Sequence, residues 1–213
     1  MGFEIQDNVL LKYIEEDDIK DIIIPDGITD IATEAFLNCS NITSVTMPES
    51  VTEIGICAFY NCSGLTSITF DNVIKIGGQA FCECTSLTAI KLPYGITEIE
   101  FETFSSCSSL KSVVIPEGVK KIGLFVFEKC ISLKEIKLPD SVTYIGYGAF
   151  ENCSSLETIK IPRGVTKIEE ETFKGCKKLS LVSISENVNE ICENAFEGCS
   201  AEIEVYHDDT RYN

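Results

Sequence analysis

Residues 133–155, LKEIKLPDSVTYIGYGAFENCSS, contain one complete unit of the pattern that decides the fold. Ile136 and Leu138 alternate with charged residues, which predicts a short strand with one buried face. The proline that follows ends this strand, because proline cannot donate a ladder hydrogen bond. Residues 142–145 predict a second short extended segment. The chain then reaches Phe150, a buried aromatic, through a turn or one turn of 3₁₀ helix.

The same pattern returns along nearly the whole chain. Phenylalanine recurs at intervals of 22 or 23 residues, and a cysteine follows each one by three residues. The phenylalanines are Phe36, Phe59, Phe81, Phe104, Phe127, Phe150, Phe173 and Phe196, and the cysteines are Cys39, Cys62, Cys84, Cys107, Cys130, Cys153, Cys176 and Cys199. One such unit cannot bury its own apolar side, whereas stacked units can. The sequence therefore predicts a repeat solenoid of about eight coils of 22–23 residues each.

We expect a single domain with three parts. Residues 1–18 lack the period, and two apolar stretches flank the turn residues Gln6, Asp7 and Asn8, which predicts an N-terminal hairpin cap. Residues 19–200 form the solenoid. Residues 201–213 predict a C-terminal cap strand and a tail. Polar ends of this kind keep a repeat array soluble.

The charge balance is acidic, with 17 Lys and Arg residues against 34 Asp and Glu residues and a formal net charge of −17. Such a chain is not expected to bind nucleic acid, which requires a basic surface. It contains no apolar run long enough to insert into a membrane. Residues 1–7 lack the basic and apolar regions of a signal peptide. With one histidine, His207, and no phosphate-binding loop, we expect no enzyme activity and no cofactor.

Eleven cysteines raise the question of disulfides or metal binding. Eight of them share one slot of the repeat, so we expect a column of buried free thiols. Each thiol is expected to bond a backbone carbonyl of the turn where the next coil begins. The paired C-x-x-C units of zinc sites are absent from the sequence. We therefore expect no disulfides and no metal, with Cys57, Cys82 and Cys192 as partly exposed thiols outside the column.

The repeat resembles the BspA-like, or Treponema pallidum-type, leucine-rich repeats over roughly residues 19–200. The motif that carries the resemblance contains Leu138, Pro139, Val142, Thr143, Ile145, Gly146, Ala149, Phe150 and Cys153. The resemblance implies a β-rich α/β, right-handed superhelix with a parallel sheet on its concave side. It also implies adhesion or surface-binding roles in proteins that are secreted or held at the cell surface. Because this chain shows no signal peptide, a cytoplasmic location is the alternative.

The first candidate surface is the predicted concave sheet. Its outward slots carry six lysines against three acids, and five of the lysines cluster in the middle of the chain: Lys91, Lys111, Lys134, Lys137 and Lys160. A positive patch on an acidic body can steer an acidic partner. The alternative is that these lysines only keep the sheet surface soluble.

The second candidate surface is an apolar stripe. The slot two residues after the second-strand isoleucine carries Phe101, Leu124 and Tyr147 in adjacent coils, with Phe125 and Tyr144 near them in sequence. An exposed stripe of this kind marks a contact site. The alternative is that these side chains pack against neighbouring turns.

These features favour a non-catalytic leucine-rich-repeat module that binds a protein or glycoprotein through its concave sheet, with adhesion as its role. Two alternatives stay open at this stage. In the first alternative the chain is a structural spacer within a larger surface protein. In the second it is a module that binds or hydrolyses glycans.

Overall fold

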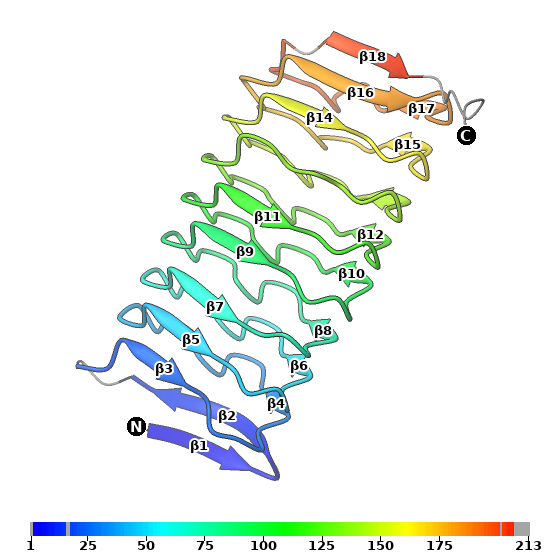
Figure 1. Ribbon diagram of the computed structural model, residues 1–213. Helices are drawn as coiled ribbons and strands as arrows, with labels where there is room; N and C mark the ends of the chain where they lie inside the picture. Colours follow the sequence, from blue (N-terminus) through cyan, green and yellow to red (C-terminus); the bar gives the residue numbers. More distant parts are fainter. Residues whose placement is uncertain (1, 16–17, 201, 207–213) are drawn as a thin grey trace.

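The computed structural model describes residues 2–15, 18–200 and 202–206. It is a solenoid in which successive coils stack along one axis, with the N-terminus at one end and β18 (Glu202–Tyr206) at the other (Figure 1). We number the coils 1 to 8 by their repeat phenylalanines, from Phe36 to Phe196. The solenoid predicted from the repeat is confirmed.

Each coil contributes up to two short strands. The first strands are β3 (Asp21–Ile23), β5 (Ser44–Thr46), β7 (Ser67–Thr69), β9 (Ala89–Lys91), β11 (Ser112–Val114), β14 (Thr158–Lys160) and β16 (Leu181–Ser185). The second strands are β4 (Asp30–Ile31), β6 (Glu53–Ile54), β8 (Lys75–Ile76), β10 (Glu98–Ile99), β12 (Lys121–Ile122), β13 (Tyr144–Ile145), β15 (Lys167–Ile168) and β17 (Glu190–Ile191). Strands of neighbouring coils pair in parallel with a shift of one whole repeat, as in the pairing of Ile22 with Val45.

We use three names for the sides of the stack. The front face is the outward side of the first strands together with residues 135–137. The side face is the outward side of the second strands and of the residues that directly follow them. The back turns are the segments around the repeat phenylalanines. The front face is the one that the leucine-rich-repeat prediction makes concave.

The N-terminal end is covered by a hairpin of β1 (Gly2–Gln6) and β2 (Val9–Ile14), which pair antiparallel. Asp7 and Asn8 form its turn with positive φ angles of 50° and 64°, a conformation that Asp and Asn tolerate better than most residues. Tyr13 of β2 lies over Phe36 of coil 1, with ring centroids 5.2 Å apart. The hairpin thus extends the aromatic stack of the core by one ring.

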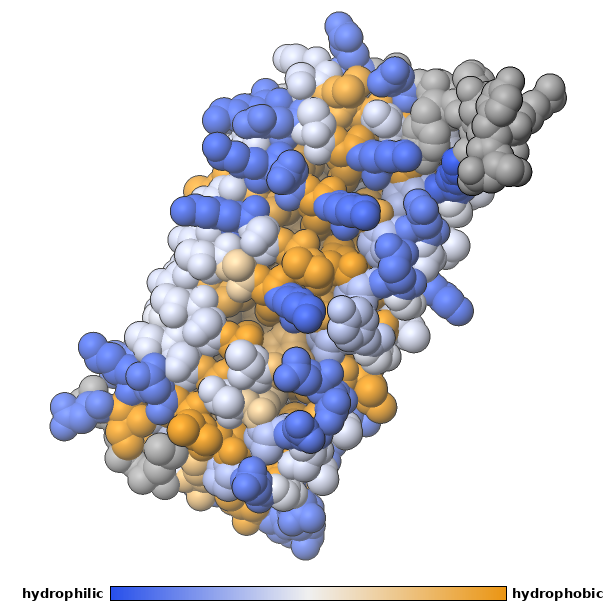
Figure 2. Space-filling model, in the orientation of Figure 1, coloured by the Kyte–Doolittle hydropathy of each residue, from blue (hydrophilic) through white to orange (hydrophobic). Residues whose placement is uncertain are grey.

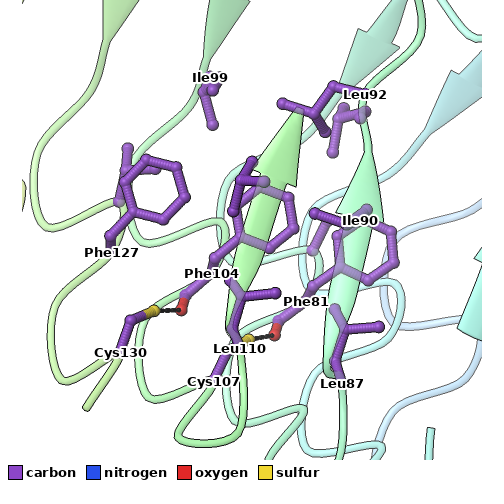
Figure 3. Close-up of a cluster of buried hydrophobic side chains, with 14 of the residues drawn as sticks. Phe81, Leu87, Ile90, Leu92, Ile99, Phe104, Cys107, Leu110, Phe127 and Cys130 are labelled. Carbon is purple, nitrogen blue, oxygen red and sulfur yellow. Dashed lines mark hydrogen bonds between the residues drawn. The ribbon is translucent and has the colours of Figure 1, made fainter. Parts of the chain in front are cut away.

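The core is built from columns of identical side chains (Figure 3). The eight repeat phenylalanines stack on one another with neighbouring ring centroids 4.7–5.8 Å apart. All except Phe196 are fully buried, and the repeat leucines from Leu65 to Leu179 and the second-strand isoleucines from Ile31 to Ile168 are buried as well. Because offset aromatic stacking adds to the burial of apolar area, this column contributes to the cohesion between coils.

The cysteines also form a column, but their acceptors differ from the prediction. From Cys62 to Cys199, each thiol lies 2.9–3.2 Å from the carbonyl oxygen of the phenylalanine 25 or 26 positions earlier, and Figure 3 shows two of these bonds. The acceptor therefore belongs to the preceding coil, not to the turn that begins the next one. All eleven cysteines are free. Cys82, predicted to be partly exposed, is buried, because its turn packs under that of coil 4.

Burial separates these thiols into two classes of reactivity. Burial raises the pKa of Cys107 and Cys130 well above the usual range, so neither forms the reactive thiolate. Only Cys57, Cys192 and Cys199 are partly exposed. We expect iodoacetamide to label these three in the native protein and all eleven after unfolding, as measured by intact-mass and peptide analysis. Rapid native labelling of Cys107 or Cys130 would contradict the buried column.

The back turns form a ladder of their own that runs through all eight coils. In coil 2, for example, the amides of Cys57, Phe59 and Asn61 donate to carbonyls of coil 3 at 2.8–3.1 Å. The first and third of these donors, Cys57 and Asn61, have positive φ angles of 53° and 54°, and twelve non-glycine residues of the coils adopt a positive φ. No helix occurs in the described part of the chain, so these turns stand where the α/β prediction would place helices.

The two strand sheets, in contrast, are interrupted. The side sheet is divided into β1-β2-β4-β6-β8, β10-β12-β13 and β15-β17, and the front sheet into β3-β5-β7, β9-β11 and β14-β16-β18. Both sheets therefore break between coils 3 and 4 and between coils 6 and 7. Coil 6 has no first strand, since residues 135–137 are not paired as a strand on either side.

A departure from the repeat coincides with the two shared breaks. The glycine after the second strand, as in IGYGAF (residues 145–150), touches the coil below: a Cβ built on Gly146 would lie 2.7 Å from the carbonyl oxygen of Gly123. Coils 4 and 7 carry IEFETF and IEEETF instead, with Glu100 and Glu169 in the glycine slot. Each glutamate needs space that a closed stack lacks. Ala32 of coil 1 and Cys192 of coil 8 fill the same slot while their second strands stay paired with the strand before them, and nothing in the structure explains why.

Candidate functional site

The five lysines of the first candidate surface are all exposed on the front face. Lys111, Lys134, Lys137 and Lys160 line two adjoining hollows of about 580 and 570 Å³. Lys91 lies outside both, with its ammonium group 5.4 Å from the centre of the Tyr94 ring. We call these two hollows together the front groove. It crosses coils 5, 6 and 7, where the front sheet is interrupted.

Two lysine pairs in register coincide with the opening of this groove. Lys111 and Lys134 occupy the same slot of coils 5 and 6, and Lys137 and Lys160 occupy the same slot of coils 6 and 7. Like charges in register on neighbouring strands are destabilising. Coil 6 carries a lysine of both pairs, and it is the coil that loses its first strand. One backbone bond, from the Glu157 amide to the Lys134 carbonyl at 3.0 Å, still joins coils 6 and 7 here.

The walls and floor of the front groove differ in chemistry. Hydroxyl groups come from Ser112, Ser132, Ser155 and Thr158, carboxylates from Glu135, Glu157 and Asp140, and the floor from Val113, Ile136 and Leu138. Figure 2 shows this face with hydrophilic residues standing over hydrophobic ones in its middle. Four lysines against three carboxylates leave a local charge of 4 − 3 = +1 on a chain of net charge −17. Such a groove can hold an extended segment that carries both carboxylates and hydrogen-bond donors.

The apolar stripe is divided by the fold. Phe101, Leu124 and Tyr144 lie together on the side face around a hollow of about 400 Å³, which Glu100 and Lys121 also line. The ring of Phe101 rests against Gly78, where a Cβ would come within 2.3–2.6 Å of it. Three of the five residues predicted for the stripe, Phe101, Leu124 and Tyr144, therefore lie around this one hollow.

Phe125 and Tyr147 point away from this hollow toward the back turns. Their rings meet edge to face with centroids 5.0 Å apart. The Tyr147 hydroxyl bonds the Glu171 carboxylate, which raises the tyrosine pKa to about 12 and lowers the pKa of Glu171. Their contacts are therefore with their own chain, as the packing alternative for this stripe expects.

Sequence reasoning missed two parts of these surfaces. Glu135 and Glu157 were counted among the outward slots of this face, but Ser132, Ser155 and Asp140 of the front groove were not, because the loss of the coil 6 strand is not visible in any one repeat. Glu100 and Lys121 were also missed, although the change from IGxxAF to IEFETF at residues 99–104 signals an unusual coil.

Two other kinds of feature, metal sites and membrane-spanning helices, were looked for in the residues that the structure describes. Among residues 2–15, 18–200 and 202–206, no three His, Cys, Asp or Glu side chains gather in a way that would hold a metal ion. Within the same ranges no helix has the length and apolar character needed to cross a bilayer.

Comparison with solved structures supports the leucine-rich-repeat interpretation. The Treponema pallidum leucine rich repeat protein is 28% identical over 93% of this chain and 86% of its own, with a TM-score of 0.63. A leucine rich cell surface protein from Faecalibacterium prausnitzii is 29% identical over 92% of this chain, with a TM-score of 0.58, and this chain covers 62% of its length. The pneumococcal vaccine antigen PcpA shares the fold at 18% identity, with 94% of this chain and 66% of its own chain covered and a TM-score of 0.60.

The search of curated proteins gives no match to this chain. The family model described as BspA type Leucine rich repeat region, in six copies, matches residues 11–123 and 97–210. Together these two matches cover residues 11–210, which include the whole of residues 19–200. The chain belongs to the BspA type leucine rich repeat family.

Proposed function

We propose that this chain is a protein-interaction module that binds an acidic, extended segment of a partner protein or glycoprotein in the front groove. The observation that supports it is the coincidence of two stacked lysine pairs with the interruption of the front sheet. Stacking like charges costs stability, and a partner carboxylate between them would remove that cost. A module of this kind needs no catalytic group.

The mixed lining of the groove favours a protein segment. A dense polyanion would meet Glu135, Glu157 and Asp140 as well as the lysines. A segment with alternating acidic and polar residues can instead place carboxylates on the lysines and donate hydrogen bonds to the acids. The relative from Faecalibacterium prausnitzii is described as a cell surface protein, and we extend to this chain an adhesive role at a cell surface.

A charge-reversal pair tests this proposal. We expect Lys134→Glu with Lys137→Glu to weaken binding of a fluorescent peptide of alternating Glu and Ser roughly ten- to hundredfold. The measurement is fluorescence anisotropy over a salt series, since added salt should weaken the wild-type complex. Lys177→Glu with Lys178→Glu is the matched control, because both lysines are exposed outside the groove.

The same variants distinguish the other two functions. The spacer function is favoured if both double variants bind the peptide with wild-type affinity and capture the same proteins from a cell-surface extract. In that case the front groove is not a binding site. Binding to a glycan array that is unchanged by Lys134→Glu with Lys137→Glu would favour a glycan-binding module instead.

A further inference from the structure

We infer that the binding surface continues from the front groove across coil 5 to Tyr94 of coil 4, so that the bound segment carries an apolar side chain next to its carboxylates. This inference rests on the proposed function, because it adds a requirement to the partner of the same groove. Two departures from the repeat support it, at Tyr94 and at Val114, together with Lys91, which lies next to both.

Tyr94 occupies a slot that is charged in every other coil. The slot lies two residues before the valine or isoleucine that begins the second extended segment of a coil. Its other occupants are Asp26, Glu49, Asp71, Glu117, Asp140, Arg163 and Glu186. Tyr94 is 76% exposed, so this replacement of a charge by an aromatic ring adds nothing to the core. An exposed tyrosine of this kind is a typical anchor residue of protein interfaces.

Val114 connects this tyrosine to the front groove. It follows Ser112 and Val113, which line the groove, and it is 55% exposed. In the parallel pairing of β9 with β11 (Figure 1), Val114 lies opposite Lys91 of coil 4. The ammonium group of Lys91 in turn lies 5.4 Å from the centre of the Tyr94 ring. Lys91, the one lysine of the predicted cluster outside the groove, is thus adjacent to it.

The row of side chains that contains Val114 carries no acid in any coil. From coil 1 to coil 8 it consists of Ile23, Thr46, Thr69, Lys91, Val114, Lys137, Lys160 and Ser183. In coils 4 to 6 a valine therefore lies between two lysines, where an apolar side chain of the partner can cover it while carboxylates bind the lysines. Glu117, which follows Tyr94 by one repeat, would repel a further carboxylate there, so the side chain that covers the Tyr94 ring is uncharged.

The distance between coils sets the spacing of these groups along the partner. Neighbouring strands lie about 4.8 Å apart, so coils 4 and 6 are separated by about 10 Å. About three residues of an extended chain cover this distance. A segment that runs along the stack and places a carboxylate on Lys137 therefore reaches Tyr94 with a residue about three positions away.

A double-mutant cycle between Tyr94 and the partner tests this inference. One fluorescent peptide has alternating Glu and Ser, and two others carry an added Phe, either three residues after the last glutamate or three residues before the first. We expect one of the Phe peptides to bind the wild type roughly five- to tenfold more tightly than the Glu and Ser peptide, as measured by fluorescence anisotropy. Tyr94→Ser should remove this gain and leave binding of the Glu and Ser peptide within about twofold of the wild type.

Ile23→Ser is the matched control, because Ile23 is an exposed side chain of the same row in coil 1, outside the groove. It should keep the full gain, and circular dichroism should show both variants folded. The inference is overturned if neither Phe peptide binds more tightly than the Glu and Ser peptide, or if the gain persists in Tyr94→Ser.

The groove itself is tested separately by Lys134→Glu with Lys137→Glu. If this double variant weakens binding of the Glu and Ser peptide while the Phe peptides show no gain, the groove proposal stands and only the extension to Tyr94 is wrong. If it binds all three peptides as the wild type does, the proposed function is wrong and this inference fails with it.

Discussion

Replacing Phe127 by alanine should lower the free energy of unfolding by about 3–5 kcal/mol, the usual cost of removing a buried phenylalanine. Phe127 is fully buried, and its ring centroid lies 5.8 Å from Phe104 below and 5.4 Å from Phe150 above. The cavity would therefore interrupt the column in the middle, where neither neighbour can move without leaving its own coil. Urea unfolding followed by circular dichroism measures the change.

Phe196→Ala is the matched control for this prediction. Phe196 closes the column at coil 8, where its ring meets Phe173 at 5.3 Å and is only partly buried. We expect less than half the loss seen for Phe127→Ala. Equal losses at the two positions would show that the aromatic column does not join the coils as described.

Replacing Gly146 by alanine should cost about 1–3 kcal/mol, the range found for overpacked interiors. A Cβ there would lie 2.7–3.0 Å from three backbone atoms of Gly123 and Leu124, and backbone atoms cannot swing aside as a side chain can. The bond from the Gly146 amide to the Ile122 carbonyl, now 2.9 Å, should lengthen and break. Hydrogen exchange at the Gly146 position should accordingly become faster, together with the loss of stability in urea.

Gly118→Ala is the control for this change. A Cβ on Gly118 would meet only ordinary contacts at 3.4–3.5 Å, and its φ is not in the left-handed region. The substitution should be neutral or stabilise by about 0.4–1 kcal/mol, because alanine restricts the unfolded chain. If Gly118→Ala and Gly146→Ala are equally costly, contact with the coil below is not the reason for glycine in the slot, and Glu100 and Glu169 do not explain the sheet breaks.

Much of the fold could be predicted from the sequence, because the solenoid follows from side chains that repeat. Phe36 and its seven counterparts, and the cysteines three positions later, occupy the columns that the period predicts. The acceptors of the thiols could not be predicted, since a period fixes which residues share a slot but not the direction in which a short side chain reaches across coils. The burial of Cys82, a residue outside the repeat slots, was missed for the same reason.

The candidate sites were less predictable because they depend on departures from the repeat. Phe101 and Tyr147 share a slot, yet one lies on the side face and the other turns to Glu171. Their different partners, Gly78 for one and Phe125 for the other, come from neighbouring coils with different residues. The front groove likewise depends on interactions between coils 5, 6 and 7, which no single repeat contains.

The uninterrupted ladder of the back turns has a mechanical consequence. It joins all eight coils on one side, whereas the strand ladders on the other two sides are missing between coils 3 and 4 and between coils 6 and 7. A pull along the stack would meet a line of linked amides that resists extension on one edge only. The stack would therefore bend, with the back turns on the shorter, concave side and the two strand sides on the longer, convex side. Coils 1–3, 4–6 and 7–8 would tilt as stiff blocks about the two breaks between them.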